Sequence, residues 1–278
     1  MMAIAIRFLL FAVGLYLIAL ALIYIFQRSF MYLPDTQRVS PEQVELDGFS
    51  VVNIMSGENK LVSWWHPPVD QTQPVILHFH GNGGALAGRA DMYRTLAASG
   101  AGLLAVGYPG YGGNAGKAGE QMFYQAARAN YGWLRKQGFR GKDIVIAGQS
   151  VGTGPAAYLA ANTNAAGLIL EAPYTSMADM AARQMPLFPS RLLVKDRYEN
   201  LSRIGKIDMP LAWIHGERDG LIPVQMGQIL FDAARQPKCA YRIEKGKHND
   251  LWTYGTGEII LEQAALMVRE RRCENRVR

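Results

Sequence analysis

A serine between two glycines, at the point where a strand pattern meets a helix pattern, constrains the fold of this chain more than any other feature. The motif is Gly148-Gln149-Ser150-Val151-Gly152. Residues 143–147 before it are typical of a short buried strand, and residues 155–161 after it are typical of a helix. A tight turn leaves no room for bulky side chains beside the serine, and glycine meets that requirement. The motif therefore predicts a nucleophile elbow, with the Ser150 hydroxyl at the top of a sheet.

Strand and helix patterns alternate through the rest of the chain. We expect helices at about 88–98, in the stretch that ends near 137, and at 257–271. Further strands are expected at residues 44–46, 50–54, 61–65, 74–80, 102–106, 167–170, 211–214 and 240–243, the first two forming a hairpin. This alternation predicts an α/β fold with a mostly parallel sheet and helices on both faces.

Size and charge narrow the class of protein. The 278 residues are 49% hydrophobic and 19% charged, which suits one large α/β domain. The formal charge of +6 comes without a basic stripe interleaved with aromatic residues, so we do not expect nucleic acid as a partner. The two cysteines, Cys239 and Cys273, allow one disulfide at most and lack metal-binding spacing. We expect them to be structural or incidental, and no metal to be bound.

The N-terminal segment differs from everything after it. Residues 8–26 are 19 residues without a charge, which as a helix would extend about 28 Å, close to the thickness of a bilayer core. A cleaved signal peptide is one alternative, because residues 19–21 read Ala-Leu-Ala, but the chain stays apolar for five more residues. A buried core helix would usually be shorter. We interpret the segment as an uncleaved, single-pass membrane anchor, and arginines on both flanks leave its orientation open.

These patterns divide the chain into three parts. Residues 1–29 are the expected anchor, residues 30–42 a connector, and residues 43–278 the α/β domain. Within the domain, residues 174–209 are longer than a minimal crossover and are placed where a small lid would cover a site, although they could also be packed helix.

A serine hydroxyl is a poor nucleophile unless a base lies within hydrogen-bonding reach. After an elbow of this kind, the partners follow in the order acid, then histidine. Three histidines precede the serine and are ruled out by that order: His66, His78 and His80. His215 precedes the best acid, so the base is expected to be His248, in a polar loop after the last strand.

The expected acid is Asp219, in the loop beyond the strand 211–214, where α/β sheets bind ligands. Its role would be to accept the ring N–H of His248, which sets the tautomer and stabilises the imidazolium. Glu217 and Asp250 are alternative acids. A structural role for Asp219 as a helix N-cap also stays open.

An oxyanion hole needs two backbone N–H groups directed at the developing negative charge. We expect one from Val151, directly after the serine. The other is expected from the loop 80–84, which reads His-Gly-Asn-Gly-Gly, with Asn82 as the first choice and Gly83 as the second. A phosphate-binding role for this loop is disfavoured because no G-K-[ST] follows it. His80 is expected to pack and hydrogen-bond beneath the loop.

Together these motifs resemble the α/β-hydrolase superfamily over roughly residues 43 to 270. The branch that they resemble is the membrane-anchored serine hydrolases related to the Bem-type and α/β-hydrolase-domain proteins, which share an N-terminal hydrophobic segment. The segments that carry the resemblance are His80-Gly81-Asn82-Gly83-Gly84, Tyr108-Pro109-Gly110-Tyr111-Gly112, Gly148-Gln149-Ser150-Val151-Gly152, Glu171-Ala172-Pro173-Tyr174-Thr175-Ser176, Asp219 and His248-Asn249-Asp250.

The resemblance implies an eight-stranded sheet, no metal or organic cofactor, and hydrolysis of esters, thioesters or amides. By position it makes Ser150, Asp219 and His248 the catalytic triad, with Asn82 and Val151 as oxyanion donors. Thr153 is a departure, since the branch often has a glycine there. This difference is expected to alter the packing behind the elbow and to leave the catalytic positions in place.

The leading hypothesis is a membrane-tethered serine hydrolase that forms an acyl-enzyme from esters or thioesters, with lipid-like molecules or acylated proteins as substrates. A peptidase of the same fold is the second hypothesis. A non-catalytic membrane-tethered binding protein is the third, disfavoured because degenerate hydrolases usually lose a triad member. The fold alone does not determine the substrate.

Overall fold

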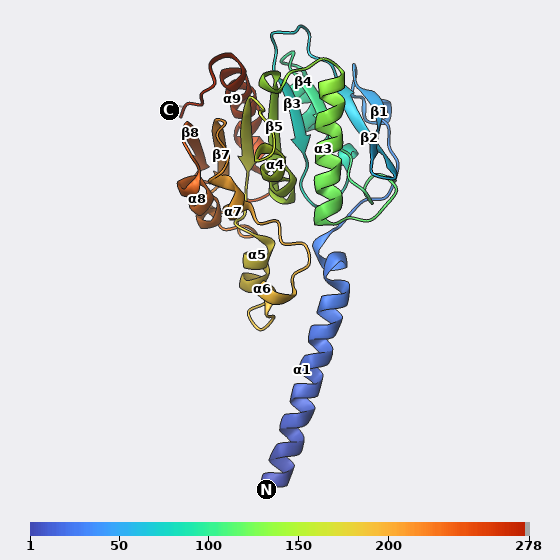
Figure 1. The fold of residues 1–278 in the computed structure, drawn as a ribbon, viewed down its shortest axis with the longest axis vertical. Helices are drawn as coiled ribbons and strands as arrows, with labels where there is room; N and C mark the ends of the chain where they lie inside the picture. Colours follow the sequence, from blue (N-terminus) through green and yellow to red (C-terminus); the bar gives the residue numbers. More distant parts are fainter. Residues whose placement is uncertain (276–278) are drawn as a thin grey trace.

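A computed structural model describes residues 1–275 as a long N-terminal helix followed by an α/β domain (Figure 1). The domain expected from the sequence extends to residue 278, so its last three residues lie outside the described part. The strands are β1 (Ser50–Ser56), β2 (Asn59–His66), β3 (Val75–Phe79), β4 (Gly102–Ala105), β5 (Ile144–Gln149), β6 (Gly167–Glu171), β7 (Leu211–Gly216) and β8 (Lys238–Ile243). The α-helices are α1 (Met2–Met31), α2 (Ala90–Ala97), α3 (Glu120–Lys136), α4 (Thr153–Ala160), α5 (Met177–Gln184), α6 (Ser190–Leu193), α7 (Asn200–Ile204), α8 (Val224–Ala233) and α9 (Thr256–Glu270).

Within the described residues, eight strands form one sheet in the order β1-β2-β4-β3-β5-β6-β7-β8. β2 is antiparallel to both of its neighbours, and every other pair is parallel. This confirms the mostly parallel sheet that the sequence predicts. Because β4 lies on one side of β3 and β5 on the other, the winding of the chain reverses there. The loops after β3 and β5 therefore meet at the topological switch point, where sheets of this kind bind ligands.

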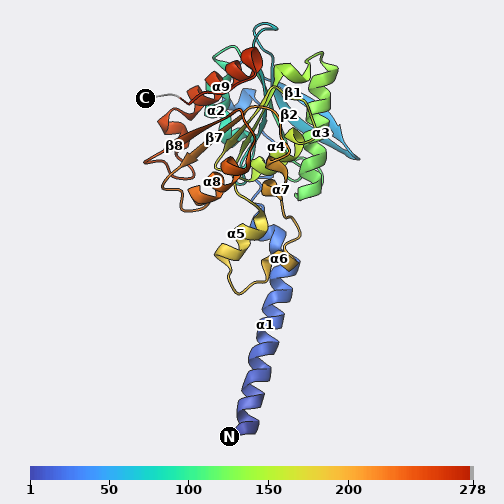
Figure 2. The ribbon, with the colours of Figure 1, turned by 60° about the vertical axis from the view of Figure 1, so that its left-hand side comes forward.

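Different helices cover the two faces of the sheet (Figure 2). Successive strand residues point to opposite faces. Leu77 and Phe79 accordingly pack with residues of α3, α4 and α8, whereas Ile76 packs with residues of α2 and α9. All five residues of β3 are buried, as expected for a strand covered on both faces.

The predicted opening hairpin is wrong. Glu42–Val44 is a turn of 3₁₀ helix, and Glu45 has a left-handed φ of 55°. Leu46, predicted to end the first strand, is instead buried in the core beside Phe49. Three residues are too few for an alternating pattern to distinguish a strand from such a turn. The hairpin that opens the sheet is formed by β1 and β2.

Helix α8 is not among the helices expected from the sequence patterns, although the alternative role of Asp219 as a helix N-cap implies a helix after that loop. It contains Gly227, and a glycine inside a helix weakens the helical signal. The structure gives the reason for that glycine: a Cβ at position 227 would lie 2.4 Å from Trp213 Nε1. Close packing of α8 on β7 therefore requires glycine at position 227, the same residue that weakens the helical pattern in the sequence.

Helix α1 extends away from the domain, and it is the one helix among the described residues that is long and apolar enough to span a membrane (Figure 1). Its 30 residues correspond to about 45 Å, more than the ~30 Å of a bilayer core. Its most apolar stretch is not buried in the structure. Helices α5 and α6, from the segment expected to be lid-like, lie beside its C-terminal part in both views (Figures 1 and 2).

Candidate active site

Ser150 lies at the junction of β5 and α4, in a turn of 3₁₀ helix over Ser150–Gly152. Its φ is 51°, a left-handed value that costs energy for a residue with a side chain. A Cβ at Gly148 would lie 2.6 Å from Gly152 O, and one at Gly152 would lie 2.2 Å from Phe79 O. Both approaches are too close for any residue but glycine. The sharp strand–serine–helix turn that the motif predicts is therefore present.

The elbow supplies a prediction about stability. We expect Gly152→Ala to lower the free energy of unfolding by about 3 kcal/mol, because the new methyl group meets backbone rather than a movable side chain. For a domain of this size, Tm should fall by roughly 6–12 °C in a thermal scan. Gly132→Ala is the matched control: Gly132 lies within α3 with nothing within 4 Å of its added Cβ, so stability should rise by up to about 1 kcal/mol. Equal Tm values for the two variants would contradict this account.

Thr153, the departure from the family pattern, fits the turn without disturbing it. Its hydroxyl is buried and donates to Ser150 O at 2.7 Å. The close packing behind the elbow occurs one residue later, where a Cβ at Gly154 would lie 2.3 Å from the ring of Tyr198. The expected change in helix packing thus consists of one difference: the small residue required behind the elbow is at position 154 instead of position 153.

The structure brings the serine, the histidine and the acid together from three separate loops. His248 Nε2 lies 3.0 Å from Ser150 Oγ, and His248 Nδ1 lies 2.8 Å from Asp219 Oδ2. Because an ionised carboxylate only accepts hydrogen bonds, Nδ1 carries the proton toward Asp219. Nε2 is then the acceptor for the Ser150 hydroxyl. A neutral imidazole in this tautomer is arranged to remove a proton from the serine.

The carboxylate of Asp219 is wholly buried and held from several sides. Burial alone would raise its pKa, but hydrogen bonds from His215 and His248 hold the pKa well below the ordinary range. Its other oxygen, Oδ1, accepts the backbone N–H groups of Leu221 at 2.9 Å and Ile222 at 2.8 Å. Asp219 therefore stays ionised at neutral pH, in a fixed orientation.

The other candidate acids lie elsewhere. Glu217 forms an ion pair with Arg242 at 3.0 Å, and Asp250 accepts the backbone N–H of Lys247 at 2.6 Å. The alternative role of Asp219 as a helix cap is also not observed, since α8 begins at Val224 with no side-chain cap. The hydrogen bonds that Asp219 Oδ1 accepts from the backbone N–H groups of Leu221 and Ile222 are those of an Asx turn.

His215, which chain order ruled out as the base, supports the acid instead. Trp213 Nε1 donates to His215 Nδ1 at 3.2 Å, so the ring proton lies on Nε2. That proton is directed at Ile222 O, 2.9 Å away, with Asp219 Oδ2 at 3.4 Å. The sequence reasoning missed this contact. The available signal was spacing, because His215 lies at a strand end four residues before Asp219.

A second buried carboxyl, Glu171, lies next to the elbow; it begins one of the segments that carry the resemblance, but its contacts were not predicted. Glu171, at the end of β6, accepts Gln149 Nε2 at 2.8 Å and Trp252 Nε1 at 3.1 Å. Burial raises its pKa above the ordinary value, although these two hydrogen bonds oppose the shift. Glu171 thereby ties the residue before Ser150 to the segment that follows His248.

The two expected oxyanion donors lie at one cavity together with Ser150. Outside helices and strands, no backbone–backbone hydrogen bond among residues 1–275 has the N–H of Asn82 or Val151 as its donor. The Asn82 side chain is held by three hydrogen bonds: Oδ1 accepts from Tyr111 and from Leu33 N, and Nδ2 donates to Met31 O. The side chain thus fixes the loop while leaving its N–H available.

His80 packs beneath this loop, as the sequence predicts. Its ring is fully buried, and the ring centroid lies 4.3 Å from that of Tyr108. Nδ1 forms a hydrogen bond with Gly81 O at 2.7 Å. Burial and the nearby Arg89 charge hold its pKa well below the ordinary value, so the ring is neutral. A neutral packed ring suits support of the loop.

Comparison with known proteins extends these observations. No protein-family model matches the chain. It is 33% identical over 227 residues to an uncharacterized protein of Mycobacterium tuberculosis, covering 81% of each chain. It is also 33% identical over 185 residues to alpha/beta hydrolase domain-containing protein 17B of Homo sapiens, covering 65% of this chain and 62% of that protein. Lysophosphatidylserine lipase ABHD12 of Danio rerio is 30% identical over 199 residues, 64% of this chain and 52% of the lipase.

Among solved structures, the esterase Pf2001 of Pyrococcus furiosus has the same fold, with a TM-score of 0.66 at 18% identity over 86% of this chain and 99% of the esterase. The sheet order, the elbow after β5 and these relatives agree with the resemblance drawn from the motifs. The chain therefore belongs to the α/β-hydrolase superfamily and is related to its α/β-hydrolase domain-containing proteins.

Proposed function

We propose that this protein is a serine hydrolase, tethered to a membrane by α1, that cleaves carboxylic ester or thioester bonds in lipid-like or acylated substrates. The observation that carries the proposal is the chain of contacts from Ser150 Oγ to His248, 3.0 Å, and from His248 to Asp219, 2.8 Å. A base so placed activates a hydroxyl that is otherwise a poor nucleophile. The lipase name of the Danio rerio relative supports the reaction class.

In the first half-reaction, Ser150 Oγ bonds to the substrate's carbonyl carbon while His248 Nε2 takes the hydroxyl proton. The N–H groups of Asn82 and Val151 stabilise the oxyanion that forms. The intermediate then expels the alcohol or thiol, which receives the proton from His248, and the acyl group stays on Ser150. In the second half-reaction, water gives a proton to His248 and attacks the acyl-enzyme. The acid leaves, and the proton returns to Ser150 Oγ. Throughout, Asp219 stabilises the imidazolium.

Labelling with a fluorophosphonate probe tests this function. We expect the full-length protein, in membranes washed with alkaline carbonate, to be labelled at Ser150, with the site identified by mass spectrometry. His248→Ala should reduce the labelling rate at least about 100-fold, since the base activates the serine. An unlabelled but folded protein would favour the non-catalytic binding protein. Labelled protein released by carbonate would contradict the membrane span.

The bond that is cleaved is tested with matched substrates. We expect 4-nitrophenyl esters to be hydrolysed and 4-nitroanilides that carry the same acyl group to show no turnover above that of Ser150→Ala. Turnover of the anilides by the parent protein would instead favour the peptidase hypothesis.

A further inference from the structure

The C-terminal part of α1 forms one wall of a cavity that begins at Ser150. The cavity has a volume of about 330 Å³, within the range of ligand pockets. Ile23, Gln27 and Phe30 line it from α1, and Met177 and Met180 line it from α5. The helix long enough to span a membrane is therefore also part of the pocket beside the candidate nucleophile.

The chemistry of the lining points to an apolar ligand. No charged side chain among the described residues lines the cavity. The polar groups of Asn82 are engaged by the chain, as described above. Gln27 is engaged as well, because its Nε2 donates to Leu193 O at 3.1 Å and its Oε1 accepts Lys195 N at 2.7 Å. Gln184, an exposed residue at the end of α5, is the remaining polar side chain of the lining. Beyond Ser150 and Gln184, the cavity thus offers aliphatic, aromatic and thioether surface, which favours a hydrocarbon chain.

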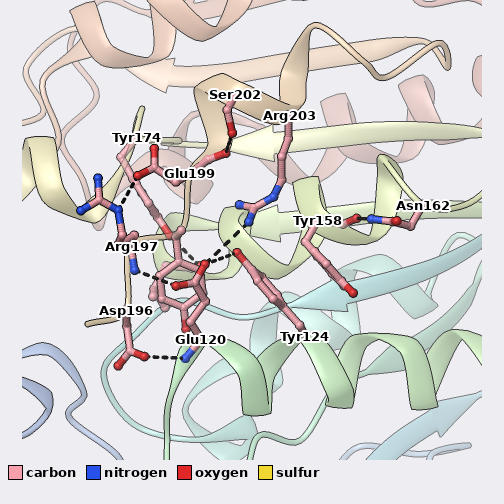
Figure 3. A network of polar contacts seen from close by, with 12 residues as sticks. Glu120, Tyr124, Tyr158, Asn162, Tyr174, Asp196, Arg197, Glu199, Ser202 and Arg203 are labelled. Carbon is pink, nitrogen blue, oxygen red and sulfur yellow. Dashed lines mark hydrogen bonds and ion pairs between the residues drawn. The ribbon is translucent and has the colours of Figure 1, made fainter. Parts of the chain in front are cut away.

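Helix α1 is fixed to the domain rather than loosely tethered. Arg28 donates two hydrogen bonds to Asp196, at 2.7 and 2.8 Å, and the Asp196 side chain is almost fully buried. Asp196 also accepts the backbone N–H of Glu120, whose carboxylate accepts Arg197 N and Tyr124 OH (Figure 3). This network joins the end of α1, the lid-like segment and the start of α3. The cavity wall formed by α1 is therefore held in place.

The lid-like segment reaches along α1 into its apolar stretch. Tyr16 OH donates to Leu187 O at 2.7 Å, and Tyr16 lies near the middle of residues 8–26. Leu187 and Leu192 are 80% and 84% exposed beside this helix. If residues 8–26 cross the bilayer core, Leu187 lies at the depth of lipid, and Leu192 lies near the end of that stretch, because the next residue, Leu193, accepts a hydrogen bond from Gln27. The cavity is then next to the bilayer.

We propose that this cavity is a subsite for the acyl chain of a bilayer lipid ester, shared between α1 and α5 and entered from within the membrane. The inference rests on the proposed function, since Ser150 must cleave the ester for the subsite to matter. The membrane helix then contributes to substrate selection as well as to anchoring. The chain would extend from the carbonyl group at Ser150 toward Ile23.

A bulky substitution on the cavity face of α1 tests the subsite. For the full-length protein in detergent, we expect Ile23→Trp to lower the ratio of kcat/KM for 4-nitrophenyl decanoate to that for the acetate at least tenfold. Ile25→Trp is the matched control, because Ile25 is 61% exposed and does not line the cavity, and its ratio should stay within twofold of the parent. Met180→Trp fills the same cavity from α5 and should act like Ile23→Trp. Unchanged ratios in both cavity variants would overturn the inference.

A second arm tests entry from the bilayer. The substrate is a lysophospholipid in phosphatidylcholine vesicles that hold the full-length protein. We expect the double variant Leu187→Asp, Leu192→Asp to lower hydrolysis of this lipid, relative to 4-nitrophenyl acetate, at least tenfold. Val69→Asp changes an apolar residue that is 71% exposed in the loop before β3, and it should leave that ratio unchanged. Equal ratios in the two proteins would contradict membrane entry. If the parent protein neither hydrolyses any of these esters nor is labelled at Ser150, the proposed function itself would be contradicted.

Discussion

Ser150→Ala is expected to lower kcat for ester hydrolysis by about 10⁵–10⁶-fold. The substitution removes the atom that would form the acyl-enzyme and leaves the elbow, the base and the oxyanion donors in place. A residual rate about 10³–10⁴-fold above the uncatalysed reaction should remain, because substrate binding and oxyanion stabilisation persist. The measurement is steady-state hydrolysis of 4-nitrophenyl acetate by purified full-length protein.

Two further variants make this result specific. Ser202→Ala changes an exposed serine on α7 whose hydroxyl donates to Glu199 O, and it should retain full activity. The double variant Ser150→Ala, His248→Ala should lose no more activity than the first substitution alone, since the two groups act as one unit. Activity of Ser150→Ala within tenfold of the parent would exclude Ser150 as the nucleophile.

Asp219→Asn is expected to lower kcat by about 10⁴-fold with little change in KM. The reason is the tautomer of His248. The amides of Leu221 and Ile222 donate to Oδ1, so the oxygen of the asparagine side chain should keep that position. Its NH₂ group then faces His248 Nδ1 and donates to it. The ring proton moves to Nε2, and the imidazole can no longer accept the proton of Ser150.

The same variant has a consequence for stability. The low pKa of Asp219 means that its interactions stabilise the folded state above the ordinary carboxyl pKa, about 4, and that this contribution is lost as the pH falls toward the lower pKa of the folded state. In Asp219→Asn this contribution is absent at every pH, so the decrease in Tm between pH 7 and pH 3 should be smaller than in the parent protein. Asp250→Asn is the matched control and should change neither kcat nor this pH dependence by much. A twofold or smaller loss of kcat in Asp219→Asn would assign the role of the acid to another residue.

The three side chains of the candidate site could be selected from sequence because each follows a strand pattern in a recognisable order. Ser150 is identified by its glycines, and His248 and Asp219 are identified by position after Ser150 and by location in loops after strands. The contacts behind them could not be selected in this way. His215 lies 3.4 Å from Asp219 Oδ2 while its ring proton is directed at Ile222 O, and Glu171 joins Gln149 to Trp252. The partners of these side chains depend on how neighbouring strands pair. Their catalytic roles stay proposals until the variants above are measured.

Local patterns alone determined the class of fold, the elbow and an N-terminal helix long enough for a membrane, because apolar periodicity and glycine placement report conformation over a few residues. They gave a strand at residues 44–46, where the chain forms a 3₁₀ turn, and no helix at α8, because three residues are too few to define a period and Gly227 weakens the helical pattern. Only the tertiary structure decided that Ile23 and Val194 line one cavity with Ser150, and that Arg28 pairs with Asp196 across 168 positions of sequence. Such contacts depend on the packing of distant segments, which no local pattern encodes.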